Sequence, residues 1–185
     1  MIAEVREYGL YVGVLTFRGV YIENPELLLR KLRGDFSGLN IQVLNARNIA
    51  GFKHILTSVL TALEAFNHKL NIAKNLSMEV LVRASTQRQI SEALNVLGIK
   101  EGVFDVAFVA IDERRGKIEE IFNTLVKYYD NRVDELLLEE DRSGQIMEIY
   151  GISEEDVEAE NEYSKGKWEA VKNLVAEKVA LTLIL

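Results

Sequence analysis

A cluster of arginine and glutamine side chains near the middle of the chain is the clearest candidate for binding chemistry. The stretch RASTQRQISEALNVLGI, residues 83–99, brings Arg83, Gln87 and Arg88 close together. Arginine suits anions because its planar guanidinium can donate two parallel hydrogen bonds to one phosphate. Arg88 is predicted to lie in the first turn of a helix, where the helix dipole favours an acidic side chain. This unfavourable placement indicates a binding role, although a solvated helix end is the simpler alternative.

The element expected to position this cluster is an amphipathic helix. Thr86 can act as its N-cap, because a threonine hydroxyl accepts hydrogen bonds from the first free backbone amides of a helix. The apolar residues that follow have the spacing i, i+3, i+4 and i+7, which defines one face of an α-helix. They are Ile90, Ala93, Leu94 and Leu97.

Charge is spread unevenly along the 185 residues, whose net charge is −7. The central segment 45–100 carries a net charge of +4, whereas the C-terminal segment 101–185 carries −11. Electrostatic fields are screened over about 8 Å at physiological ionic strength. A local basic patch can therefore attract phosphate even on an acidic protein.

Other patterns that could support chemistry are weak. The chain has no cysteine, and its two histidines, His54 and His68, would lie about 21 Å apart along one helix, too far to share a metal ion. Asp112 and Glu113 are adjacent at a strand end, a pattern more typical of a surface than of a catalytic pair. No phosphate-binding glycine motif or nucleophile motif is present. A non-enzymatic role without metal or cofactor is therefore expected.

The residue pattern predicts one mixed α/β domain over residues 1–185, with a small, largely antiparallel or mixed sheet packed by several helices. No run of eighteen apolar residues occurs and the start is no signal peptide, so a cytoplasmic protein without a membrane contact is expected. The predicted strands are 4–9, 10–17, 40–45 and 103–112. The predicted helices are 25–33, 48–70, 78–84, 86–97, 117–129, one starting at Ser153, and 164–182; for 78–84 a strand is the alternative.

The helix over 48–70 shows the clearest apolar stripe. Its predicted core-facing side chains are Ile49, Phe52, Leu56, Val59, Leu60, Leu63, Phe66 and Leu70. Its predicted opposite face carries His54, Ser58, Thr61, Ala65 and His68.

Three stretches resemble the small kinase-binding subunit of the KEOPS complex, the family that includes the PRPK-binding protein. The most specific is NLSMEVLVRASTQRQISEALNVLGI, followed by LNARNIAGFKHILTSVLTALEAF. YGISEEDVE and AEKVALTLIL are weaker matches to the family's last helices. The sequence departs from the family at Thr86, where glycine is usual, and the segments 113–147 and 160–168 are longer than usual.

The resemblance implies an accessory subunit rather than an enzyme. KEOPS installs threonylcarbamoyl groups on the adenosine next to the anticodon of tRNAs. The family binds the kinase-like ATPase subunit, reaches the other KEOPS subunits through it, and is implicated in holding the single-stranded CCA end of tRNA. The matching positions implied for tRNA binding are Arg83, Gln87, Arg88, Asn45, Lys53 and His54. Ile90, Leu94, Leu97 and Ile99 are the candidates for the kinase interface, with a role in the core as the alternative.

Two other functions fit the same residues. The protein could be a scaffold that binds only the kinase, with structural arginines. It could also be a small nucleotide-acting enzyme that uses His54 as a base, which would require a pocket and a carboxylate partner.

Overall fold

The computed structural model describes residues 1–129 and 133–184 and confirms the predicted α/β class. The chain divides into two compact units, each built from two stretches of sequence. Unit 1 comprises residues 1–47 and 98–137, and unit 2 comprises residues 48–97 and 138–185. The grouping of all residues into one domain stays a prediction.

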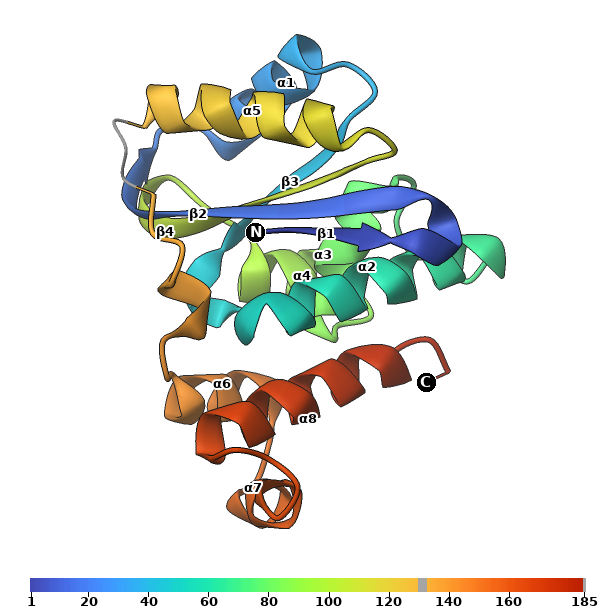
Figure 1. The fold of residues 1–185 in the computed structure, drawn as a ribbon, viewed down its shortest axis with the longest axis vertical. Helices are drawn as coiled ribbons and strands as arrows, with labels where there is room; N and C mark the ends of the chain where they lie inside the picture. The colour runs from blue at the N-terminus through green and yellow to red at the C-terminus, as the bar shows by residue number, and fades with distance from the viewer. Residues whose placement is uncertain (130–132, 185) are drawn as a thin grey trace. The chain divides into compact units, whose positions relative to one another are not determined.

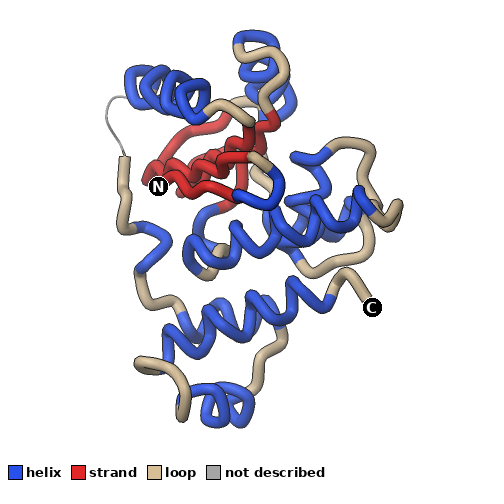
Figure 2. The backbone as a smooth tube through the Cα atoms, turned by 45° about the vertical axis from the view of Figure 1, so that its right-hand side comes forward, coloured by secondary structure: helices blue, strands red, loops and turns tan. Residues whose placement is uncertain are grey.

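Unit 1 is a four-stranded antiparallel sheet with two helices (Figures 1 and 2). Its strands lie in the order β1-β2-β4-β3. Two helices of the unit, α1 and α5, pack on the strands. The bounds are β1 Ile2–Val5, β2 Leu10–Ile22, α1 Pro25–Asp35, β3 Asn40–Asn45, β4 Gly102–Asp112 and α5 Arg115–Tyr128.

Local sequence signals account for several of these elements. Gly9 adopts φ +61° between β1 and β2 and so supplies the left-handed residue that their tight connection needs. The side chain of Asn24 accepts a hydrogen bond from the Leu27 amide, and Pro25 opens α1, as predicted. Gly13 on β2 permits α5 to pack closely, since a Cβ there would lie 2.4 Å from Ile118 Cγ2.

Unit 2 is a bundle of helices. α2 (Gly51–Asn67) packs against both α3 (Leu76–Ser85) and α8 (Lys167–Leu181), and Figure 1 shows α2 and α8 side by side. α4 (Ile90–Leu97) contacts α3, while α6 (Ser143–Tyr150) and α7 (Glu154–Asn161) contact α8. Ser153 and Asp156 form a reciprocal capping box at the start of α7, which confirms the predicted helix start.

The predicted orientation of α2 is only partly right. Ile49 and Val59 of the expected core stripe are fully buried, whereas Phe52, Leu56, Leu63 and Phe66 are only half-buried. The other fully buried apolar residues of α2 are Ile55, Ala62 and Ala65. His54, Ser58 and Thr61, expected on the polar face, are buried as well. The reason is that α2 has helical neighbours on more than one side, and small side chains allow those neighbours to approach closely.

The predicted N-cap at Thr86 is wrong. Residues 76–85 are helical, as favoured over a strand, and Thr86 ends this helix with φ +57° and ψ +16°. α4 begins only at Ile90, so Gln87 and Arg88 lie in the connecting loop rather than in a first helical turn. A left-handed conformation at Thr86 agrees with the glycine that the resembling family has at this position, because glycine adopts it without a steric penalty.

Replacement of Thr86 by glycine is expected to stabilise the protein. A left-handed backbone costs an L-residue about 1–2 kcal/mol, and glycine avoids this cost. Glycine loses more conformational entropy on folding, which cancels about 0.5–1 kcal/mol of that gain. The free energy of unfolding, measured by urea denaturation, should rise by up to about 1 kcal/mol in T86G. The control T86A keeps the Cβ atom and should gain nothing. Equal stability of the two variants would contradict the backbone argument.

Candidate functional site

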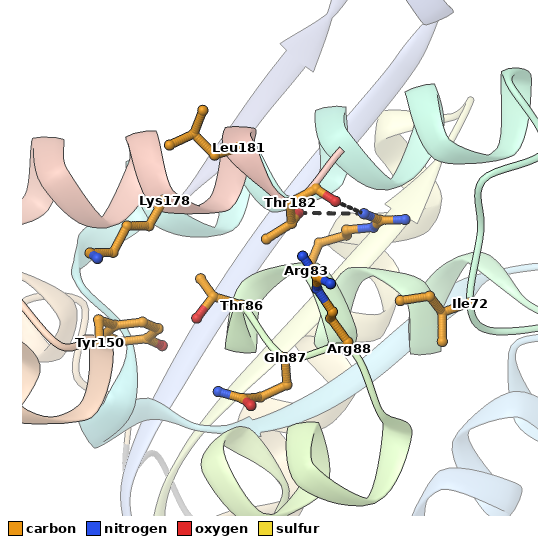
Figure 3. A pocket seen from close by; sticks show the side chains of 9 residues that line it. All are labelled: Ile72, Arg83, Thr86, Gln87, Arg88, Tyr150, Lys178, Leu181 and Thr182. Atoms are coloured by element: carbon orange, nitrogen blue, oxygen red, sulfur yellow. Dashed lines mark hydrogen bonds between the residues drawn. The ribbon is translucent and has the colours of Figure 1, made fainter. Parts of the chain in front are cut away.

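A cavity of about 290 Å³ in unit 2 contains the RNA-binding candidates that the structure brings together (Figure 3). Its walls come from the end of α3, the loop before α4, the last turn of α8 and Tyr150 at the end of α6. We call it the α3–α8 pocket. Its lining residues are Ile72, Arg83, Thr86, Gln87, Arg88, Tyr150, Lys178, Leu181 and Thr182.

The lining of the α3–α8 pocket is cationic. Arg83, Arg88 and Lys178 contribute to it, and no aspartate or glutamate does. Exposed Arg88 and half-buried Lys178 are the two cations whose side chains reach solvent, and they lie on opposite sides of the pocket in Figure 3. The partly exposed side chains of Ile72 and Leu181 add apolar surface. An anionic ligand with an apolar portion therefore fits this lining.

Arg83 is buried rather than exposed, which corrects the expectation from the sequence. Its side chain is 3% exposed, and its Nε donates to Glu79 Oε1 at 2.8 Å. Its two terminal nitrogens donate to the carbonyl oxygens of Thr182 at 2.5 Å and Leu70 at 2.8 Å. Glu79, also buried, compensates the guanidinium charge. Arg83 therefore has a structural role in the pocket wall.

Gln87 is half-buried and held close to the end of α3. Its backbone amide donates to Ser85 Oγ at 3.2 Å, and its side-chain nitrogen lies 3.4 Å from the Ser85 carbonyl oxygen. These contacts hold the loop that presents Arg88. Gln87 and Arg88 therefore remain candidates to contact a ligand directly.

His54 lies outside the pocket and is fully buried, so its predicted role in RNA contact is wrong. The Ala50 amide donates to His54 Nδ1 at 3.1 Å, which places the proton on Nε2 and lets Nε2 donate to the Ala84 carbonyl at 2.8 Å. Desolvation lowers the pKa of His54 to about 4, so the ring is neutral near pH 7. Both ring nitrogens are occupied by backbone groups, which also removes the basis for a catalytic base at this position.

The remaining RNA-binding candidates do not join the pocket. Lys53 is exposed and donates to Asn173 Oδ1 at 2.7 Å. Asn45 belongs to unit 1, where its side chain accepts from the Arg47 amide at 3.2 Å. The structure therefore groups Arg83, Gln87 and Arg88 and leaves out Asn45, Lys53 and His54.

Lys178 and Tyr150 are among the pocket residues that were not singled out from the sequence. Each lies in the last turn of a helix far along the chain, and its residue type is ordinary there. Only the resemblance of AEKVALTLIL to the family's end could have drawn attention to Lys178. Buried Tyr150 donates its hydroxyl proton to the Asn48 carbonyl at 2.8 Å, and burial raises its pKa.

The four residues predicted for the kinase interface differ in their exposure to solvent. Leu97 is fully buried on the inner side of α4, so it has the core role that was the alternative to docking. Ile99 is half-buried and packs against the core of unit 1. Ile90 is half-buried, and Leu94 is 39% exposed. Leu94 is thus the most accessible of the four.

Two negative findings apply to residues 1–129 and 133–184. These residues contain no group of three or more His, Asp or Glu side chains placed to hold a metal ion. Within the same ranges, no helix combines the length and the hydrophobicity needed to cross a membrane.

Comparison with known proteins shows the family. Residues 17–182 match the model of the family described as kinase binding protein CGI-121. The chain belongs to this family. A relative named regulatory protein Cgi121, from Methanocaldococcus jannaschii, is 38% identical over 117 residues, which cover 62% of this chain and 72% of the relative. Membership supports an accessory, regulatory role, and it confirms the family resemblance seen in the two central motifs.

Removal of Arg83 should destabilise the protein strongly. Arg83→Ala leaves the Glu79 carboxylate buried without its cation, which typically costs about 3–5 kcal/mol. Arg88→Ala, in the exposed loop, should change the free energy of unfolding by less than about 0.5 kcal/mol. Urea denaturation of the two variants checks this difference. A loss below about 1 kcal/mol for Arg83→Ala would show that the buried ion pair does not form.

Burial of neutral His54 should make stability depend on pH. The unfolded chain takes up a proton near the ordinary pKa of 6.5, whereas the folded chain does so only near 4, so stability is lost as the pH falls through this window. Between pH 7 and pH 5 the expected loss is about 2 kcal/mol, from 1.4 kcal/mol per pH unit. His54→Gln should lack this part of the pH dependence. His68→Gln, at the exposed end of α2, is the matched control and should retain it.

Proposed function

We propose that this protein is a non-catalytic accessory subunit of the KEOPS complex, acting in threonylcarbamoyl modification of tRNA in the cytoplasm. Its partners are the kinase-like ATPase subunit, through it the other subunits, and tRNA. Membership of a family described as kinase binding, and a relative named a regulatory protein, support the kinase partner and the regulatory role.

We further propose that the α3–α8 pocket holds the single-stranded 3′ CCA end of tRNA. The observation that carries this proposal is the cationic, carboxylate-free lining of the pocket on a protein whose net charge is −7. Single-stranded RNA is bound by cationic grooves together with apolar or aromatic surfaces for the bases. Arg88 and Gln87 supply the donors, while Ile72 and Leu181 supply apolar surface.

The dimensions of the pocket favour the end of a strand over a duplex. A volume of about 290 Å³ is at the lower limit for sites that enclose a small ligand. Such a cavity accepts the end of a single strand more readily than a base-paired helix, whose recognition needs a broad surface. A free 3′ end is the part of a tRNA that can enter it.

Kinase binding is expected to use a different surface. Leu94 and the half-buried Ile90 on α4 are the members of the predicted interface that a partner can reach. An apolar contact of this kind is insensitive to salt, whereas phosphate contacts weaken steeply as ionic strength rises. Salt dependence therefore separates RNA binding from the alternative of a kinase-only scaffold.

Replacement of Arg88 should weaken tRNA binding without affecting folding. Arg88→Ala removes one charge-assisted contact, so the affinity for intact tRNA should fall by about 1–3 kcal/mol. The slope of log affinity against log salt should decrease by about 0.7, the value for one single-strand phosphate. Filter binding or fluorescence anisotropy over a series of salt concentrations measures both quantities.

Two controls identify the part of the RNA that is bound. A tRNA without its CCA end should bind the unmodified protein at least as weakly as intact tRNA binds R88A, and R88A should cause no further loss with the tailless tRNA. Association with the cognate kinase subunit should be unchanged in R88A. Equal binding of intact and tailless tRNA would refute the proposal for the pocket and favour the scaffold.

A further inference from the structure

One buried ion pair connects three of the segments that line the α3–α8 pocket. Glu79 Oε2 accepts hydrogen bonds from the backbone amides of Ile72 and Ala73, at 2.9 and 2.6 Å. Arg83, paired with Glu79, donates to the carbonyl of Thr182 at the end of α8. The pair therefore holds the loop that carries Ile72 and the last turn of α8 against α3.

The charge of Arg83 is not available to a ligand. Its Nε is 2.8 Å from a buried carboxylate, and both terminal nitrogens already donate to backbone carbonyls. Three of its five N–H groups donate within the wall, and the side chain is only 3% exposed, so a phosphate would have to enter the protein interior to reach it. Arg83 can nevertheless affect binding through the residues that it holds in place.

Lys178 is the residue that this arrangement brings to the pocket. It lies four positions before Thr182, so the two side chains project from the same face of α8. The Thr182 hydroxyl donates to the Val179 carbonyl at 2.7 Å and keeps the last turn of the helix closed. Figure 3 shows Arg83 reaching Thr182 and shows Lys178 and Arg88 on opposite sides of the pocket.

We propose that Lys178 is a phosphate-contacting residue of the α3–α8 pocket and that Arg83 is the positioning residue that holds it there. This inference rests on the proposed function, because it assumes that the pocket binds RNA. Arg88 and Lys178 then contact the phosphates from two sides, from a loop and from a helix end. Two cations across the pocket allow a strand to be held by more than one phosphate.

The test measures the affinity of the full-length chain for intact tRNA at several salt concentrations. Lys178→Ala should weaken binding about 5- to 20-fold and decrease the salt slope by about 0.7. Lys165→Ala is the matched control, since it removes the same charge from an exposed position outside the pocket lining. It should change affinity less than 2-fold.

The positioning role is tested with Arg83→Lys, which keeps the positive charge but lacks the fork that bonds Glu79, Thr182 and Leu70 together. This variant should also bind tRNA about 5- to 20-fold more weakly, measured at a temperature where circular dichroism shows it folded. In combination with Lys178→Ala it should cause no further loss, because both changes remove the same contact. A merely structural role of Arg83 would lower stability and leave the affinity of the folded protein unchanged.

The outcomes separate this inference from the proposed function. If R88A and tailless tRNA show weak binding but K178A behaves like K165A, the inference is overturned and the proposed function stands. If the losses of R83K and K178A multiply, Arg83 does not act through Lys178 and the positioning role is overturned. If intact and tailless tRNA bind equally, both proposals fail. Should R83K not fold, Arg83→Gln replaces it, and the comparison of K178A with K165A still decides the phosphate contact.

Discussion

The buried pair of Glu79 and Arg83 is the interaction on which the arrangement of unit 2 around its pocket depends. Moving an ion from water into a protein interior costs several kcal/mol even after relaxation, so both charges need hydrogen bonds from every side. Glu79 obtains them from the backbone amides of residues 72 and 73 and from Arg83, and Arg83 obtains its acceptors at residues 70 and 182. Because these partners are mostly backbone groups, satisfying the charges also holds three segments in one geometry.

Neutral His54 also joins two segments of unit 2 by bonding their backbone groups, but it does so without a charge. Its ring accepts the amide of Ala50 before α2 and donates to the carbonyl of Ala84 near the end of α3. The Asn48 carbonyl, in the same irregular turn, accepts a hydrogen bond from the Tyr150 hydroxyl. The rings of His54 and Tyr150 pack edge to face, with their centroids 5.3 Å apart. The His54 and Tyr150 side chains thus satisfy backbone groups outside regular helix pairing, which explains why His54 of α2 points inward.

An acidic protein can still have a cationic site if no acidic side chain lines that site. The last third of the chain is strongly acidic, yet Lys178 of that region joins Arg88 of the basic central segment in one pocket. Since screening limits the reach of surface charges, the local lining rather than the net charge decides which ligand is attracted. This division fits a protein that binds a nucleic-acid end at one place and another protein elsewhere.

The sequence by itself determined the features that depend on neighbours along the chain. The Asn24–Pro25 start of α1, the Ser153–Asp156 capping box and the Gly9 turn all follow from residues a few positions apart, and the central motifs sufficed to indicate the family. Only the tertiary structure decided which faces are buried. Arg83 meets Thr182 across 99 residues, and His54 meets Ala84 across 30. Periodicity reports that a side chain lies on a face, but whether that face meets solvent depends on helices far away in sequence. For this reason Arg83 and His54 were expected at the surface and lie inside. For Leu97 the sequence left core and surface open. Lys178 lines the pocket because α8 packs near α3.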